Sequence, residues 1–274
     1  MATVAGRLVE QQRRPDYLSG TPRANAVDRW IYVGMAAWFI AIVLSGFIPD
    51  SLMKIEMVRT GQRPPFPIVL HMHAVLMGTF LLLLITQTAL AATDRLDVHR
   101  RLGLVAMVLA PLLVTVGTVL IPTTYNGLLA AVEAAPAGAK EGPLQGVRIW
   151  ENIMLLQIWI GVCFALFLFI GLKARGASAG LHKRMMILAV AMPLPAGIDR
   201  IPWLPHTMPA SPLSAELWVL VAVAPMFLWD VYRNRSVHRA YWIWLGVNVP
   251  IAFLVNTFWD TPAWHSAAKA LMGV

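Results

Sequence analysis

Charged side chains are scarce in this sequence. Asp, Glu, Lys and Arg make up 13% of its 274 residues, whereas an ordinary soluble domain contains about 25%. Hydrophobic residues account for 58% of the chain, and the mean hydropathy is +0.65. This balance excludes an ordinary soluble domain and predicts an integral membrane protein.

Cysteine and several common catalytic motifs are also missing. The one cysteine, Cys163, lies in an apolar run, so an intramolecular disulfide is excluded and the compartment cannot be inferred from redox chemistry. There is no Gly-rich phosphate loop, nucleophile elbow, paired-cysteine metal site or zinc-protease helix motif. Soluble hydrolases and nucleotide-driven enzymes therefore lose most of their support. Residues 1–29 lack the apolar core of a cleavable signal peptide.

Seven apolar segments dominate the chain, and each has about the length that a tilted membrane helix needs. They predict an all-α, polytopic membrane bundle of seven transmembrane helices, with one N-terminal helix followed by three helical hairpins. The expected domains are a polar N-terminal arm (1–29), a transmembrane domain (30–260) and a short external tail (261–274). The segments are 30–48, 67–92, 102–121, 150–172, 183–201, 214–231 and 240–258.

The distribution of Lys and Arg predicts the orientation of these helices. The N-terminal arm and alternate loops carry 15 of these residues, against 7 on the other side. Because cytoplasmic loops are enriched in basic residues, we expect the N-terminus in the cytoplasm and the C-terminus outside. The net charge of +8 then reflects topology and attraction to anionic membrane lipids, and we expect no nucleic-acid partner.

Three loops on the basic side end in a histidine followed by a basic residue. These histidines are His99, His182 and His238, and their similar setting indicates a degenerate internal repeat. One interpretation is that they contact lipid phosphates at the starts of helices. The other makes His99 and His182 the axial ligands of a haem b. Both histidines are expected to precede their helices, where water competes with a ligand.

The opposite side gathers imidazole and carboxylate groups. His71, His73, Glu151 and Asp199 are a possible ligand set for a zinc or iron ion, or a proton relay to a quinol. Residues two apart on a helix point about 200° apart, so His71 and His73 cannot both bind one metal on a regular helix. Polar residues along both faces of segment 67–92 also predict that this helix is central in the bundle. Arg200 and His206 complete the polar cluster expected here.

The starts of two segments also resemble a known family. The quoted runs are His99-Arg100-Arg101-Leu102-Gly103 and His182-Lys183-Arg184-Met185-Met186, the second span closing with Asp199-Arg200. In order and spacing they are similar to the YozB-like group, bacterial predicted membrane proteins of unknown function. The resemblance covers roughly the second to fifth spans. It implies a bacterial inner-membrane location and a helical bundle, but no reaction.

These observations leave the function open between two classes. The leading hypothesis is an inner-membrane electron-transfer protein that carries a haem b or a single Zn or Fe ion and exchanges with quinol. The alternative is a non-catalytic membrane subunit, or a small-ligand or lipid-binding protein, whose polar cluster only ties helices together. A transporter is a third possibility. Membrane lipids, quinone and other membrane subunits are the expected partners, and whether the protein is an enzyme stays undecided.

Overall fold

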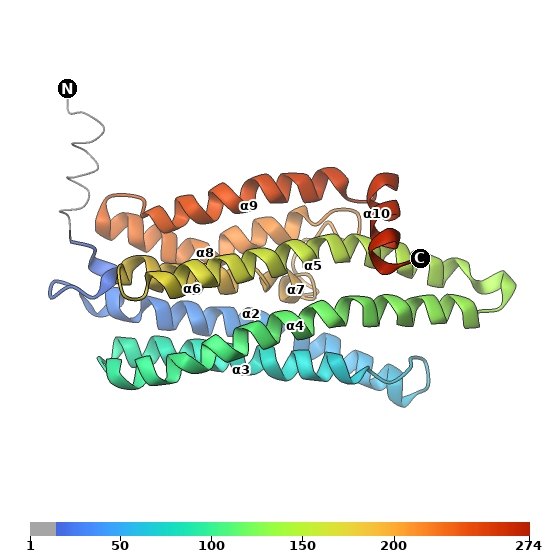
Figure 1. Cartoon of the computed structure of the whole chain (residues 1–274), viewed down its shortest axis with the longest axis horizontal. Helices are drawn as coiled ribbons and strands as arrows, with labels where there is room; N and C mark the ends of the chain where they lie inside the picture. Colours follow the sequence, from blue (N-terminus) through green and yellow to red (C-terminus); the bar gives the residue numbers. More distant parts are fainter. Residues whose placement is uncertain (1–14) are drawn as a thin grey trace, which may run out of the picture.

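A computed structural model describes residues 15–274 of the chain as a bundle of long helices (Figure 1). No strand occurs within these residues. Two short 3-10 turns, η1 (Tyr17–Ser19) and η2 (Ala137–Ala139), accompany the helices. The helices are α2 (Ala26–Arg59), α3 (Ile68–Ala92), α4 (Leu96–Ala134), α5 (Glu141–Ala174), α6 (Ala179–Ala191), α7 (Leu194–Ile198), α8 (Leu213–Asn234), α9 (Arg239–Phe258) and α10 (Pro262–Met272).

Six of these helices, namely α2, α3, α4, α5, α8 and α9, are long and apolar enough to cross a membrane. Their most apolar windows have a mean hydropathy of 1.3 to 2.6. Many large apolar side chains on their outer surfaces are exposed, which in water would be unfavourable but suits a lipid environment. The chain is therefore a multi-pass membrane protein, and its all-α polytopic class is as the sequence predicts.

The fifth apolar segment is interrupted rather than continuous. It forms α6 and the short α7, separated at Met192 and Pro193. Pro193 and Pro195 have no backbone N–H to donate, so a regular helix is weakened at this point. The two pieces and the following loop nevertheless connect opposite ends of the bundle. Helix α6 begins beside the end of α5, and α8 begins at the opposite end, beside the end of α9. Seven membrane crossings stay a prediction.

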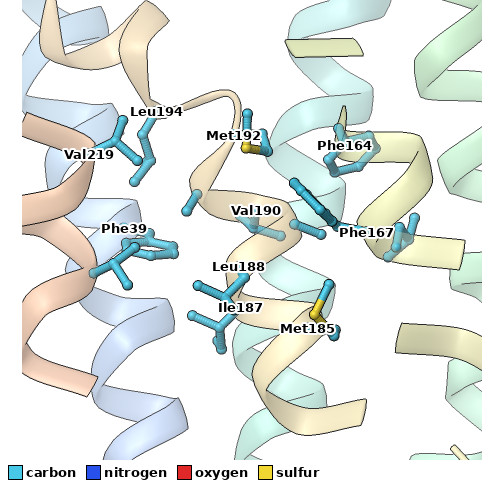
Figure 2. Packing of buried hydrophobic residues seen from close by; sticks show 14 of the residues in the cluster. Phe39, Phe164, Phe167, Met185, Ile187, Leu188, Val190, Met192, Leu194 and Val219 are labelled. Atoms are coloured by element: carbon cyan, nitrogen blue, oxygen red, sulfur yellow. The ribbon is translucent and has the colours of Figure 1, made fainter. Parts of the chain in front are cut away.

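The centre of the bundle is α6, and the prediction that segment 67–92 is central is wrong. Nine of the 13 residues of α6 are buried, and Figure 2 shows Ile187, Leu188 and Val190 among aromatic side chains of α2 and α5. In contrast, α3 lies at the edge of the bundle beside α4 (Figure 1). The threonines of α3 need no partner helix, because Thr79 and Thr86 donate to carbonyls of their own helix.

The two ends of the bundle differ in their contacts. At one end, which we call the basic end, α2 begins beside the end of α8, where Asp28 pairs with Arg233. The N-terminal turns of α4 and α6 also meet there, at His99 and His182. At the far end, Asp50 of α2 pairs with Arg200 after α7, and α10 lies across the bundle (Figure 1).

The contact between α2 and α7 depends on glycine and provides a test of the fold. A Cβ on Gly46 would overlap the carbonyl of Gly197. Gly46→Ala should therefore force the two backbones apart and cost about 1–3 kcal/mol, lowering the Tm of the purified protein in detergent. Gly34→Ala in the same helix is the control, because its Cβ would meet open space. Equal Tm values for the two variants would contradict this packing.

Candidate haem site and charged clusters

His99 and His182 occupy equivalent positions in two helical hairpins. Each is the fourth residue of its helix, since α4 begins at Leu96 and α6 begins at Ala179. The expectation that both histidines precede their helices is therefore wrong. Both side chains are half-buried between neighbouring helices. This position protects the two imidazoles better than a loop in water would.

Each imidazole is fixed by a carbonyl of the preceding helix. His99 Nδ1 lies 3.1 Å from the Gln87 carbonyl oxygen, and His182 Nδ1 lies 2.8 Å from that of Gly171. A carbonyl only accepts hydrogen bonds, so each Nδ1 must carry the proton. In the neutral ring, Nε2 then keeps a free lone pair. This is the tautomer and second-shell contact that metal-binding histidines commonly have.

Glycines permit the close helix contacts on which these hydrogen bonds depend. In the first hairpin, a Cβ on Gly103 would come within 3.2 Å of the Gln87 amide nitrogen, and that amide donates to the His99 carbonyl. In the second hairpin, a Cβ on Gly171 would come within 3.2 Å of both Met185 and Met186. The two hairpins therefore use the same local design to orient their histidines.

The two rings lie next to each other across the α4–α6 contact. Their centroids are 6.3 Å apart, and the ring planes are nearly perpendicular at 87°. Two imidazoles bound on opposite sides of one metal ion, each at about 2 Å, have ring centres about 6 Å apart. An edge-to-face contact between two free rings covers the same distance range. The separation fits either arrangement. Because a carbonyl engages Nδ1 of each ring, Nε2 is the nitrogen that is left for a metal.

The third histidine of the sequence repeat is arranged differently. His238 is the N-cap of α9, and its Nδ1 accepts from the Ala240 backbone N–H at 3.1 Å. Its Nε2 lies 4.0 Å from a carboxylate oxygen of Asp16. The structure therefore repeats the ligand-like arrangement in two hairpins, while the third histidine belongs to a charged cluster.

That cluster is centred on Arg184, which is completely buried. Its guanidinium donates to Asp230, also completely buried, with Nε–Oδ2 and Nη2–Oδ1 distances of 2.5 and 2.8 Å. It also donates to both carboxylate oxygens of Asp16 at 2.8 Å. Sequence reasoning missed this cluster. The available signal was an acidic residue, Asp230, within an apolar segment, since a buried charge requires a partner.

The residues predicted as a metal site at the far end do not form one group. Among residues 15–274, no three His, Cys, Asp or Glu side chains gather closely enough to hold a metal ion. His71 is exposed and meets the Phe66 ring edge-on, with centroids 6.0 Å apart. His73 packs beside Gly117, with its Nδ1 buried and without a hydrogen-bond partner among the described residues.

The remaining far-end candidates also have separate environments. Asp199 is the C-cap of α7, and the neighbouring Arg200 instead pairs with Asp50, with Nε 3.3 Å from Oδ2. His206 lies in the loop before α8, with its Nδ1 3.2 Å from the Met208 carbonyl oxygen. Of these three residues, Arg200 links the end of α7 to α2, and His206 makes its hydrogen bond within its own loop.

Glu151 is completely buried and lies in a different cluster. One carboxylate oxygen accepts from the Tyr125 hydroxyl at 3.1 Å, and the other lies 2.5 Å from His265 Nδ1. His265 Nε2 is 2.9 Å from Asp260, which also accepts from Asn152. A 360 Å³ pocket adjoins this cluster between α5 and α10.

The C-terminal members of this cluster were also missed. His265 belongs to the segment that was expected to be a short tail (261–274), and Asp260 directly precedes it, but these residues form α10 and the turn before it. The capping signal was present in the sequence, because Thr261 followed by Pro262 is a common helix start. The cluster fastens α10 to α5. A further link between these two helices is the Trp264 indole N–H, which donates to the Glu151 carbonyl.

No family model, curated protein or solved structure matches this chain. The resemblance to the YozB-like group therefore stays a prediction.

The charged cluster at the basic end predicts a pH-dependent stability. Burial lowers the pKa of His238 to about 4, with the Arg184 charge acting in the same direction. Burial alone would raise the pKa of Asp16, but its hydrogen bonds with Arg184 hold it below its ordinary value. Since an unfolded histidine has a pKa of about 6.5, the unfolded chain binds more protons between about pH 4 and 6.5.

The contribution of His238 to stability should therefore rise with pH across that window and become constant above it, while the contribution of Asp16 is lost only below about pH 4. The measurement is the Tm of the purified protein in detergent from pH 4 to 8. In His238→Gln the rise between pH 4 and 6.5 should be reduced. An unchanged pH dependence in this variant would rule out His238 as its source.

Proposed function

We propose that this chain is a membrane-embedded electron-transfer protein that binds a haem b between His99 and His182. The observation that carries the proposal is the pair of half-buried imidazoles, 6.3 Å apart, each with Nδ1 turned to a backbone carbonyl. Bis-histidine ligation needs two such nitrogen donors facing a shared iron. The repeated hairpin arrangement supports the same assignment.

The number of ligands favours haem over a bare zinc or iron ion. Protein sites for zinc generally supply three or four side chains, and non-haem iron sites supply at least three. Within residues 15–274, no third His, Cys, Asp or Glu joins the pair to form such a group. A haem needs only two axial ligands from the protein, because the macrocycle provides the other four.

The roles of the chain's own residues follow from this geometry. His99 and His182 would hold the iron, and the carbonyls of Gln87 and Gly171 would fix both ring orientations. These hydrogen bonds increase the basicity of the imidazoles, which favours the oxidised metal. A bound haem would supply one-electron chemistry. A quinol in the membrane is the corresponding class of electron donor, and the resemblance to the YozB-like group supports a bacterial inner membrane as the location.

The alternative of a non-catalytic membrane subunit or a small-ligand or lipid-binding protein is supported by the far end. There, Asp50 and Glu216 each contact a partner on another part of the chain, namely Arg200 and Asn256. Glu151 likewise joins α4, α5 and α10. Such contacts tie helix ends together without any cofactor. In that case the basic-end histidines would also be structural.

The two functions are separated by a reduced-minus-oxidised visible spectrum of the purified protein, read together with its metal content. The haem proposal predicts a stoichiometric b-type spectrum that is lost or strongly reduced in His99→Ala and His182→Ala. His206→Ala is the control, because this histidine is exposed at the far end and its Nδ1 lies beside the Met208 carbonyl of the same loop. A folded, colourless and metal-free wild-type protein would exclude the haem and metal proposals and favour the alternative.

A further inference from the structure

Asp16 contacts Arg184 as a separate ligand would contact a binding site. It belongs to a short segment, Asp16–Gly20, that precedes the bundle helices and contains the 3-10 turn η1. Both Asp16 oxygens accept from the fork of Arg184, with Nη1–Oδ2 and Nη2–Oδ1 distances of 2.8 Å. This side-by-side geometry is the one by which arginine recognises free carboxylates.

The bundle forms most of the cradle around this carboxylate. Asn234 Nδ2 of α8 lies 3.3 Å from Oδ1, and His238 Nε2 lies 4.0 Å from Oδ2. Gly180 of α6 leaves the necessary space, because a Cβ there would overlap Oδ2. Three different helices or helix caps therefore converge on one carboxylate position.

The cradle does not depend on Asp16 for its own shape. Arg184 is held independently by Asp230 through Nε and Nη2, and by the Gly180 carbonyl through Nη1 at 3.0 Å. Asn234 is also held by Asp230, at 2.6 Å. With Asp230 balancing the charge of Arg184, removal of Asp16 would leave an oriented, buried guanidinium edge with two unused N–H donors.

The segment that carries Asp16 is fastened by additional contacts. Leu18 is completely buried in the core, and the Tyr17 backbone N–H donates to Asn234 at 3.0 Å. The Lys183 ammonium donates to the Ser19 carbonyl at 3.2 Å, which places a further positive charge beside the cradle. The segment thus covers the Arg184 site from the side of the basic end.

We propose that the Arg184 cradle is a binding site for a small carboxylate ligand, and that Asp16 is a built-in occupant that closes it. Displacement of Asp16–Gly20 opens the site, and a ligand carboxylate then accepts the same two N–H groups of Arg184. The site is separate from the His99–His182 pair, since Arg184 and His182 are two residues apart on α6 and point to different faces.

The test is a chemical rescue with formate. Asp16→Ala should lower the Tm of the purified protein in detergent, because it removes the carboxylate from the cradle. Sodium formate should restore about 2–4 °C with a saturable concentration dependence, as expected for a ligand that binds only the folded state. Sodium chloride at the same ionic strength should not restore it. Wild type should gain no such increment, since Asp16 already fills the site.

Two controls make the result specific. Glu56→Ala removes a carboxylate that pairs with Arg59 at the exposed end of α2, where its loss leaves no buried cradle, and it should not be rescued in the same concentration range. If Asp16→Ala does not fold, Asp16→Ser is measured in the same way, because its hydroxyl offers an acceptor for the Leu18 N–H and its shorter side chain leaves the cradle open to formate. Equal effects of formate and chloride, or equal formate effects on wild type and variant, would overturn the proposal.

Discussion

The structure depends on the burial of one arginine near the basic end of a membrane bundle. Arg184 is fully enclosed, so its guanidinium must be paired in place, and removing one partner of such a pair costs about 3–5 kcal/mol. Its partners come from α8 and from the segment before α2. This single residue therefore fixes the rotation of α6, the end of α8 and the entry of the chain into the bundle.

The rotation of α6 links this ion pair to the candidate haem site. Because His182 is two residues before Arg184, directing Arg184 toward α8 turns His182 to the opposite side of α6, toward the ends of α4 and α5. The central position of α6 makes this arrangement rigid, since its other side chains pack against aromatic residues of neighbouring helices (Figure 2). Arg184 and His182 thus lie on two faces of one short helix, which positions the charged cluster on one side and one of the two imidazoles on the other.

The sequence predicts the class of the fold well and the partners of its polar residues poorly. Apolar segments define membrane helices directly, and the His-basic repeat identifies His99 and His182 as equivalent. The contacts of Glu151 with His265 and of Arg184 with Asp16 span over 100 residues, so no local pattern indicates them. The starts of α4 and α6 were predicted too late, because both helices begin before their apolar parts. The position of α3 was predicted wrongly because its Thr hydroxyls suggested contacts with other helices, whereas they donate to carbonyls of α3 itself.

The most direct test of the proposed bis-histidine ligation is the spin state of any haem that the purified, oxidised protein contains, measured by electron paramagnetic resonance. Two imidazoles on one iron predict a six-coordinate, low-spin signal in wild type. Removing either His99 or His182 should convert any haem that remains to a high-spin form, whereas His238→Ala should keep the low-spin signal. A high-spin wild-type haem, or a low-spin signal that survives in both single variants, would contradict ligation by this pair.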